Sequence, residues 1–457
     1  MRIVMTECDW TERDLKLFTS SFEGNVFTSQ ASGYLSACEL FNGMIEKRPA
    51  LILQCKSYSD VPKAVRFARD HSSGVSIKGG GHNLSGIALN HEGITIDISL
   101  LRRAGVIPNK NLVLAQGGCR LGDIDLATSR SGLAVPLGTV SDTGVGGLAL
   151  GGGIGWLLPK YGLTCDNIEQ IELVDHKGEI VHASMEANTE LFWALCGGGG
   201  GNYGIVTNFT FRAWPILNVL AGSVIFDISE ISLAMSALDS INQQGSSDLC
   251  AIVNLMHIPK YGDCVSLDIC SINIKLDENE LRSRLTSGAR PLEYSIAQMP
   301  FIEFQRMFDA AAKRGLRRYA KSLFLNDLSS DFVSVIDSCF RGRPSQETSV
   351  FVEEFHGKFN QSRFINPAFT SRDARYNLHI QACWTLPSHD VENLSWLNNT
   401  VTQLKKFARN GGSYINYNSD LNESKSSVFT DDLISKLMKV KAQFDPQNFF
   451  LGTLSRK

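Results

Sequence analysis

Three glycine-rich regions in the first half of the chain limit what it can fold into. They span residues 79–81, 144–155 and 197–204. Because glycine has no side chain, the backbone at each region can approach another segment or a ligand closely, and its N–H groups stay uncovered. The chain has 40 glycines in 457 residues, and their clustering indicates loops that enclose a ligand.

The first glycine region leads directly into a histidine. Lys78 precedes Gly79–Gly81, and His82, Asn83 and Gly86 follow. Bare N–H groups can hold an anion such as a phosphate, and the adjacent imidazole is a candidate nucleophile. From these residues alone, a cofactor loop and a glycine-rich turn with a chance histidine are equally acceptable interpretations.

The residues before this loop have the pattern of a βαβ unit. A short apolar strand is expected at 49–55, a helix starts at Ser59 or Asp60, and a second strand covers 75–78. Ligands of α/β units bind beyond the carboxyl ends of strands, and the second strand places the loop there.

The composition changes near residue 215. Glycine becomes sparse after this point, and longer strands such as 250–257 and 349–358 alternate with amphipathic helices. Strands and helices without strict βαβ order indicate an α+β fold built on an antiparallel sheet. The expected segments are 1–215, 216–410 and 411–457.

Two expectations concern local structure. Residues 302–313 have the apolar spacing of a helix. Residues 136–156 have few charges and no helix-forming run, which indicates a buried loop packed against a large, flat ligand.

Composition and charge exclude several classes of protein. A net charge of −3 and a pI of about 6.3 do not fit a nucleic-acid or membrane-surface partner. No stretch is long enough for a membrane span, and residues 1–10 lack the apolar run of a secretory signal. The eleven cysteines are irregularly spaced, so we expect reduced, buried thiols in a cytoplasmic protein. No histidine pair indicates a metal site, and nothing indicates an oligomeric state.

Two stretches match the spelling of the dinucleotide-binding fingerprint without its context. Residues 144–149 follow a polar loop, not a clear strand. Residues 199–204 lie between a helix and a strand, which reverses the order that the fingerprint requires. We therefore do not expect a Rossmann site for NAD.

Motifs spread along the whole chain form a more specific set. They are Gly79–Asn83, Gly144–Gly155, Lys160–Leu163 with Asp166–Asn167, Glu190–Leu195 with Gly197–Gly204, Phe369–Trp384, Tyr414–Tyr417 and Asp445–Phe449. This set resembles the flavin oxidoreductases of the vanillyl-alcohol-oxidase type. Within that group it is most similar to the berberine-bridge-enzyme-like oxidases and the 6-hydroxy-D-nicotine oxidases.

The resemblance implies an α+β fold with FAD as cofactor. Residues 1–215 would form a two-lobed FAD-binding domain of the PCMH type, and 216–410 an antiparallel-sheet substrate domain with helices on one face. Residues 411–457 would return to the FAD domain. The FAD-binding residues implied are Lys78, Gly79, Gly80, Gly81, His82, Asn83, Gly86, Gly138, Thr139, Thr143, Gly144, Gly146, Gly147, Gly152, Gly153, Gly155, Asp166, Asn167, Gly204, Ile205, Val206 and Asn416.

By the same resemblance, His82 is bonded to the flavin 8α-methyl group. Many relatives form a second bond through a cysteine after a Pro-x-Gly motif, and Val140 stands at that position here. Cys165 belongs to a later motif, so we expect a single link through His82. Thr143 aligns with a position thought to control oxygen access, and its small side chain weakly favours access.

The implied reaction is hydride transfer from substrate to FAD, with reoxidation by O2 to give H2O2. Tyr417 is the implied base for the substrate O–H or N–H, assisted by Tyr414, although both rings also fit ordinary packing. An unperturbed phenol has a pKa of about 10. Neighbours would therefore have to lower the pKa of Tyr417 for it to act near neutral pH.

Four side chains of the second domain are candidate substrate contacts. Glu354 and His356 fall on one face of a strand. Gln381 and Trp384 lie on a different strand. Each fits a core or surface position equally well. Three functions stay open: an oxidase of a small alcohol, amine or natural-product intermediate, a flavin-retaining cyclase without net redox turnover, and a flavoprotein that only binds.

Overall fold

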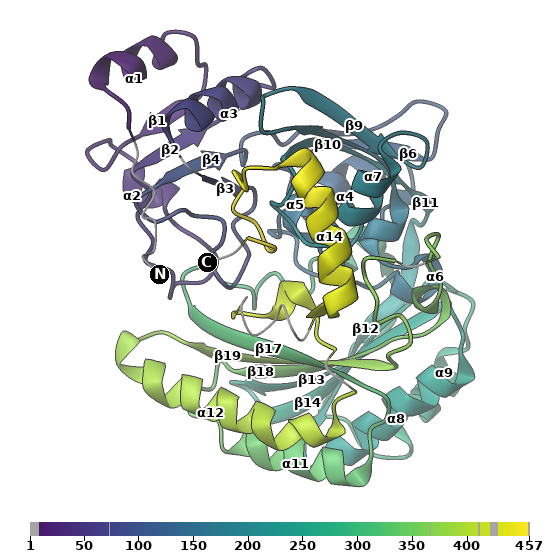
Figure 1. Ribbon diagram of the computed structural model, residues 1–457. Coiled ribbons are helices and arrows are strands. Elements are labelled where there is room, and N and C mark those ends of the chain that lie inside the picture. The colour runs from purple at the N-terminus through teal and green to yellow at the C-terminus, as the bar shows by residue number, and fades with distance from the viewer. Residues whose placement is uncertain (1–8, 73, 366, 410–411, 421–427, 456–457) are drawn as a thin grey trace.

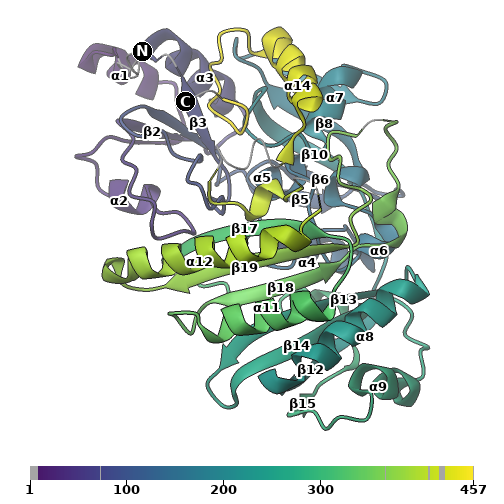
Figure 2. The same ribbon diagram turned by 60° about the horizontal axis from the view of Figure 1, so that its bottom comes forward.

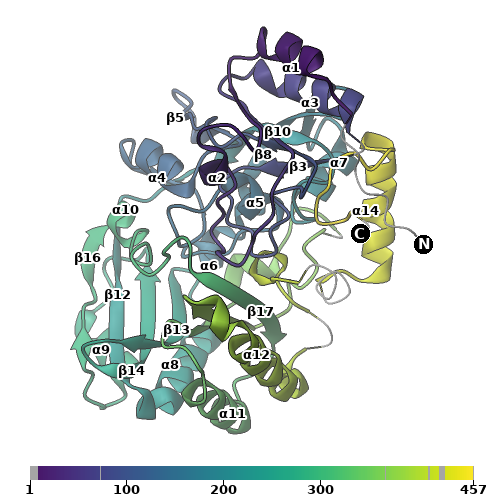
Figure 3. The same ribbon diagram turned by 90° about the vertical axis from the view of Figure 1, so that its left-hand side faces the viewer.

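The structure is a computed structural model that describes residues 9–455 except 73, 366, 410–411 and 421–427. Two expectations fall on residues outside this description. Residues 1–8 make up most of the stretch that lacks the apolar run of a secretory signal, and residues 410–411 are the expected domain boundary. Figures 1 and 3 show two α/β lobes packed above one large sheet, with a C-terminal helix returning to the lobes.

The first lobe is built on the expected βαβ unit. Helix α3 (Asp60–His71) connects two strands that both pair in parallel with a third strand between them. Its Val61, Ala64, Val65 and Ala68 are fully buried, as their spacing predicts. The sheet order is β1 (Asn25–Phe27), β2 (Leu51–Gln54), β4 (Ile94–Asp97), β3 (Val75–Lys78), with α1 (Glu12–Thr19) and α2 (Tyr34–Ala37) preceding β2.

The second lobe is an antiparallel sheet flanked by short helices. Its order is β5 (Ala104–Val106), β6 (Leu112–Gln116), β10 (Ile205–Arg212), β8 (Ile168–Val174), β9 (Ile180–Ser184). The other elements are α4 (Leu121–Ser129), β7 (Leu133–Ala134), α5 (Val145–Leu150), α6 (Leu158–Tyr161), α7 (Thr189–Leu195) and β11 (Trp214–Pro215).

Helix α5 corrects the expectation of an uninterrupted loop at 136–156. Glycine costs about 1 kcal/mol relative to alanine inside a helix, so Gly146 and Gly147 argue against one. Val145 and Ala149 of this helix are nevertheless fully buried. Tertiary packing of the buried face therefore outweighs the weak intrinsic propensity.

Residues 218–384 form the large antiparallel sheet. Its order is β15 (Glu293–Tyr294), β12 (Asn218–Asp227), β14 (Gly262–Ser271), β13 (Leu249–Ile258), β18 (Ser349–Glu354), β19 (Tyr376–Trp384), β17 (Arg317–Leu325), and β16 (Ala297–Pro300) also pairs with β12. One face packs against α8 (Ile231–Gln244), α9 (Glu278–Thr286), α11 (Ser330–Arg341) and α12 (Asp390–Leu404) around a common apolar core (Figure 2). The two lobes cover the opposite face (Figure 1). The α+β fold with helices on one face is thus confirmed.

The helix expected at 302–313 is wrong beyond its first turn. Only α10 (Phe301–Phe304) is helical. The following residues turn toward the second lobe, where the carboxylate of Asp309 accepts from Ser141 N at 2.8 Å and Gln305 Nε2 donates to Gly138 O at 3.1 Å. These contacts between domains outweigh the local helical spacing.

The C-terminal segment returns to the lobes. Helix α14 (Asp431–Phe444) packs against α7, and Phe450 forms a parallel bridge with Val75 at the start of β3. Buried Lys441 donates to Asn202 O and Phe450 O and pairs with Asp445. These bonds fix the last residues beside β3 and the third glycine region.

Among the described residues, no helix has both the length and the apolar character that crossing a bilayer requires. The ten cysteines in this part of the chain are buried and unpaired. The same residues contain no group of His, Cys, Asp or Glu side chains suited to a metal ion.

Candidate active site

A cavity of about 1080 Å³ lies where the two lobes, the large sheet and the C-terminal segment meet. Small-molecule and cofactor sites usually measure about 300–1,000 Å³, so this cavity has room for a large cofactor and a substrate. Its lining includes Gly79–His82 of the first lobe, Gly144, Gly146 and Gly147 of the second, Glu353 of the sheet and Tyr417 of the C-terminal segment.

The first two glycine loops touch backbone to backbone. A Cβ atom on Gly80 would lie 2.4 Å from Gly144 N, and one on Gly144 would lie 2.5 Å from Gly80 N. Only glycine permits this approach at both positions. The contact places His82, just after the first loop, beside Asp142 and Thr143, just before the second.

His82 is held from three sides. Its ring stacks on Phe41 with centroids 4.1 Å apart, Nε2 lies 3.1 Å from Asp142 Oδ2, and Nδ1 lies 3.4 Å from Thr143 Oγ1. Burial lowers the pKa of the imidazole, and the hydrogen bond to Asp142 only partly opposes this. The ring is therefore neutral at neutral pH, with Nε2–H donating to the carboxylate and the lone pair on Nδ1.

Asp142 is the charged centre of this corner. Arg120 and Arg314 both pair with its carboxylate, and Arg314 also donates to Gly80 O at 2.7 Å. Burial opposes ionisation, but the hydrogen bonds from His82 and Arg314 and the two positive charges lower the pKa of Asp142 to about 2. Arg314 precedes β17, so the segment that leads into the large sheet takes part in fixing the histidine loop.

These walls fit FAD. Bare backbone at the glycines can approach a diphosphate, while Ile77, Ile98, Leu148 and Val206 give apolar surface for a flat ring. The residues implied for FAD that line the cavity are Gly79, Gly80, Gly81, His82, Asn83, Gly138, Thr139, Thr143, Gly144, Gly146, Gly147, Gly204, Val206 and Asn416.

The other residues implied for FAD lie outside the cavity lining. They are Lys78, Gly86, Gly152, Gly153, Gly155, Asp166, Asn167 and Ile205. Lys78, for example, donates to Ala37 O at 2.7 Å and pairs with Asp97, so its charge is used inside the first lobe. Ile205 belongs to the apolar core of that lobe.

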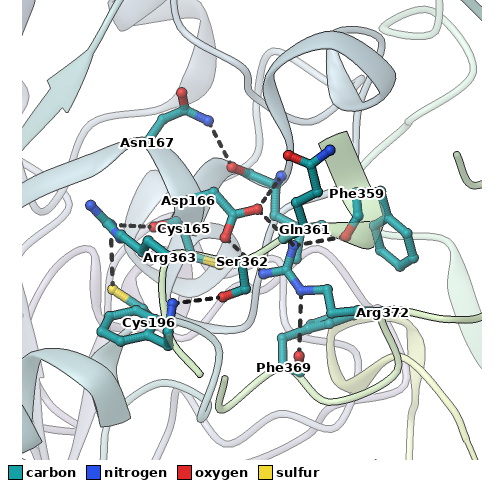
Figure 4. A network of polar contacts seen from close by, with 12 residues as sticks. Cys165, Asp166, Asn167, Cys196, Phe359, Gln361, Ser362, Arg363, Phe369 and Arg372 are labelled. Carbon is teal, nitrogen blue, oxygen red and sulfur yellow. Dashed lines mark hydrogen bonds and ion pairs between the residues drawn. The ribbon is translucent and has the colours of Figure 1, made fainter. Parts of the chain in front are cut away.

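Asp166 connects the second lobe to the domain of the large sheet, and Asn167 lies beside it (Figure 4). Asp166 accepts two hydrogen bonds of 2.7 Å from Arg372, which belongs to the loop between β18 and β19. Asn167 accepts from Trp214 Nε1 at 2.9 Å and donates to backbone carbonyls. The pair of Asp166 with Arg372 positions the second lobe against the loop, the bonds of Asn167 stay within the lobe, and neither side chain lines the cavity.

The two tyrosines of the C-terminal segment have different surroundings. Tyr414 Oη accepts from Gly153 N at 2.8 Å and from Asn416 Nδ2 at 2.7 Å, and its ring is fully buried. Tyr417 Oη donates to Glu353 Oε1 at 3.0 Å, and its ring stacks on His379 with centroids 4.1 Å apart. Tyr414 is thus engaged with the second glycine region, and Tyr417 with the sheet.

The environment of Tyr417 does not provide the lowered pKa that a base near neutral pH would need. Burial raises the pKa of the phenol well above its usual value, and the negative charge of Glu353 adds to the rise. Burial also raises the pKa of Glu353 to about 7, although hydrogen bonds from Asn377 and Tyr417 oppose this. Burial lowers the pKa of His379 to about 3, so that ring is neutral.

Strand register decides which sheet residues face the cavity. Glu353 of β18 pairs with Ile252 of β13 and with Asn377 of β19, and both Glu353 and Ile252 line the cavity. Side chains alternate along a strand, so Glu354 faces the helices. There it accepts from Ala251 N at 2.9 Å.

Of the four expected substrate contacts, Gln381 lines the cavity and Glu354, His356 and Trp384 do not. His356 Nε2 contacts Ser246 O at 3.1 Å, and Trp384 Nε1 donates to Asp390 at the start of α12. Sequence reasoning missed Glu353 and His379. The alternation within each strand was a usable signal, but it did not reveal which face was the cavity face.

Comparisons with known proteins agree with this geometry. Residues 49–184 match the family FAD binding domain, and residues 413–455 match the family berberine and berberine like. The chain is 28% identical over 433 residues to the FAD-linked oxidoreductase YgaK of Bacillus subtilis, covering 93% of this chain and 95% of the relative.

Two solved structures have similar folds. The structure of 6-hydroxy-D-nicotine oxidase from Arthrobacter nicotinovorans superposes with a TM-score of 0.84 at 26% identity, covering 94% of this chain and 97% of that one. BBE-like 1 from Physcomitrella patens has a TM-score of 0.86 at 22% identity, covering 95% and 97%.

Proposed function

Because this chain belongs to the FAD-linked oxidoreductases of the berberine-bridge-enzyme-like type, we propose that it is an oxidase of a small alcohol, amine or natural-product intermediate. FAD, when bound, accepts a hydride from the substrate carbon and passes the two electrons to O2, giving H2O2. One observation carries the proposal. The same cavity is lined by the glycine loops with His82 and by three polar side chains, those of Tyr417, Gln381 and Glu353.

The glycine loops and the C-terminal segment hold the cofactor in this proposal. His82 would hold FAD through a covalent link to its 8α-methyl carbon. The ring is neutral and its proton is on Nε2, which donates to Asp142. Nδ1 therefore carries the lone pair that a new bond needs. Val140 at the position of the second link and the buried Cys165, which lies outside the cavity lining, support a single link.

The sheet and the C-terminal segment bind the substrate. Gln381 supplies an amide donor and acceptor, Phe351 and Met256 supply apolar surface, and Tyr417 is the hydroxyl through which the substrate O–H or N–H loses its proton. The described part of the lining mixes apolar walls with a few placed polar groups, which is typical of a small-molecule site.

A substrate panel tests this function. Purified holoenzyme is mixed without oxygen with 6-hydroxy-D-nicotine, D-glucose or benzyl alcohol, and flavin absorbance is followed. An oxidase loses its flavin absorbance with a substrate and, once air is admitted, recovers it while releasing peroxide. Loss of absorbance without peroxide in air would mean that another acceptor replaces O2. Product formation while the flavin stays oxidised would instead indicate a cyclase.

A further inference from the structure

We propose that the end of the cavity beside Asp268 is a subsite for a positively charged nitrogen of the substrate, such as an ammonium or amidinium group. The proposal deepens the oxidase function above by naming a class of substrate, and it rests on that function. It starts from three polar side chains of the cavity lining that the proposed reaction does not use, those of Ser223, Asn254 and Asp268.

Strand pairing places Asp268 in one row with Glu353. Asp268 of β14 lies opposite Ser223 of β12 on one side and Ile252 of β13 on the other (Figure 2). Ile252 in turn lies opposite Glu353 of β18. Directly opposite residues share a face of the sheet, and two strand spacings put the backbone of Asp268 about 10 Å from that of Glu353. One substrate molecule can therefore reach from the reacting end beside Tyr417 to Asp268.

Asp268 is a buried carboxylate without a positive partner. Its Oδ1 accepts from Ser223 Oγ at 2.6 Å and its Oδ2 from Ser266 Oγ at 2.9 Å. Among the described residues, no Lys, Arg or His forms an ion pair with it. Burial raises its pKa to about 6, although the two serine hydrogen bonds oppose this, so the group is mostly ionised at neutral pH. Buried charges are normally paired, and here the cavity is where a partner has room.

The neighbouring polar atoms are acceptors of hydrogen bonds. Ser223 Oγ uses its proton on Asp268, so it offers only lone pairs to a ligand. Asn254 lies two positions along β13 from Ile252, on the same face, and is 5% exposed. Its Nδ2 donates to Met256 Sδ at 3.5 Å, and its Oδ1 has no hydrogen-bond partner in the part of the chain that the structure describes. Acceptors backed by a negative charge match the N–H donors of a cation and repel an anion.

The chain does not supply the missing positive charge from the cavity wall. The side chains of the described lining that can carry one are His82, His257, Lys313 and His379. His82 and His257 each pair with another aspartate. Lys313 is exposed, and the ring of His379 is neutral because burial lowers its pKa to about 3. A ligand is therefore the remaining source of a cation for Asp268.

The wall between the two ends of the row is apolar. Ile252 separates Asp268 from Glu353, and it belongs to one apolar cluster with Phe308 and Phe351, which also line the cavity. The rings of Phe308 and Phe351 meet edge to face with centroids 6.3 Å apart. Such surfaces suit an aromatic body. The substrate class is thus a molecule with an oxidisable alcohol or amine at one end, an apolar middle and a cationic nitrogen at the other.

The first arm of the test measures binding without any reaction. Benzamidinium, benzamide and benzoate have nearly the same shape but carry a positive, no and a negative charge, and none has a C–H bond beside its polar group that could deliver a hydride. Their binding to the holoenzyme is measured by titration calorimetry at about pH 8, where Asp268 is ionised. We expect benzamidinium to bind at least about 10-fold more tightly than either analogue. Benzamidinium binding no tighter than that of benzamide would overturn the proposal.

Variants of the subsite locate the binding. We expect Asp268→Asn to weaken benzamidinium binding by at least about 30-fold and to leave benzamide binding unchanged. Asn254→Leu keeps the size of the side chain but removes the unpartnered oxygen, so it should weaken benzamidinium binding by about 5-fold or more. Glu354→Gln, which changes a buried carboxylate outside the lining, should bind benzamidinium as the wild type does.

Unchanged benzamidinium affinity in Asp268→Asn would overturn the subsite. Flavin absorbance and melting temperature show whether each variant is folded. If Asp268→Asn does not fold, Asn254→Leu decides by the same criterion, because that change introduces no charge and removes none.

The second arm adds the reacting end. The holoenzyme is mixed without oxygen with 4-(hydroxymethyl)benzamidine or 4-(hydroxymethyl)benzamide, and flavin absorbance is followed. We expect the amidine to reach half of its limiting rate at a concentration at least about 10-fold lower than the amide. Asp268→Asn should abolish this difference with a smaller change in the limiting rate, because the subsite binds a part of the substrate remote from the reacting carbon.

The two arms separate this proposal from the oxidase function. Wild-type flavin reduction by both alcohols with the same concentration dependence would overturn the subsite and leave the oxidase in place. If neither these alcohols nor the substrate panel reduces the wild-type flavin, the oxidase function is what fails. The calorimetric arm then still decides whether Asp268 and Asn254 bind a cation.

Discussion

His82 donates Nε2–H to Asp142 across 3.1 Å, and Asp142 is itself paired with Arg120 and Arg314. This arrangement joins three parts of the site, because the histidine belongs to the first lobe, Asp142 to the second and Arg314 to the segment that leads into the large sheet. It also fixes the neutral ring in one tautomer, with the lone pair on Nδ1. The chemistry proposed for His82 therefore depends on a residue that the motif search did not single out.

Replacing Asp142 tests this dependence. In Asp142→Ala the acceptor for Nε2–H is lost, so we expect a clear fall in the fraction of flavin that stays with acid-precipitated protein. Asp142→Asn keeps an acceptor oxygen and should retain more of the link. Equal covalent flavin in Asp142→Ala and wild type would show that the hydrogen bond does not prepare His82.

The contact between Gly80 and Gly144 predicts a severe effect of one methyl group. In Gly80→Ala the added Cβ would lie 2.4 Å from Gly144 N, so the two loops must separate. We expect loss of bound flavin and a lower melting temperature. Gly105→Ala is the matched control, because a Cβ there meets nothing within 4 Å. Full flavin content in Gly80→Ala would contradict the close packing of the loops.

The ion pair of Arg372 and Asp166 predicts a large cost for breaking it. Both side chains are largely buried, at 9% and 13% exposure, so Arg372→Met leaves a buried carboxylate without its partner. Removing one partner of such a pair costs about 3–5 kcal/mol of unfolding free energy. Arg409→Met, which breaks the exposed pair with Asp373, should cost no more than about 1 kcal/mol. Denaturant unfolding of both variants measures the difference, and equal costs would contradict the account.

The raised pKa of Glu353 makes stability depend on pH. Its pKa is about 7 in the folded protein and about 4.3 in an unfolded chain. The folded state therefore binds more protons between these values, and wild-type stability falls as pH rises through this window. Glu353→Gln lacks this loss, so it should gain stability relative to the wild type as the pH is raised from about 4 to about 8. Melting curves that stay parallel over this range would contradict the burial of Glu353 as an ionisable group.

The sequence located the cofactor loops better than the substrate contacts. The βαβ unit and the glycine motifs predicted a loop beyond a strand end, and the structure places Gly79–His82 at the cavity. Backbone approach requires glycine itself, so the residue type carries the information. Asp166 and Asn167 belong to equally specific motifs, yet Asp166 joins the domains and Asn167 bonds within its own lobe, because a motif does not distinguish residues that touch a ligand from residues that support them.

The choice of Glu354 over Glu353 has a physical cause. Both faces of strand β18 carry apolar side chains, with Val352 buried against the helices and half-buried Phe351 at the cavity. Alternation identifies two faces but not which of them meets the cofactor domain. Only the register with β13 and β19 settles this, and that pairing joins residues about 100 and 24 positions away in the chain.

The most direct test of the covalent link through His82 is to denature the purified protein in acid or SDS and to look for flavin fluorescence on the polypeptide, with its intact mass. We expect one attached flavin that is absent in His82→Ala and retained in Cys165→Ala. Release of all FAD from the wild-type protein would contradict the covalent link through His82. Absence of any flavin would contradict the assignment of the glycine-lined cavity as an FAD site.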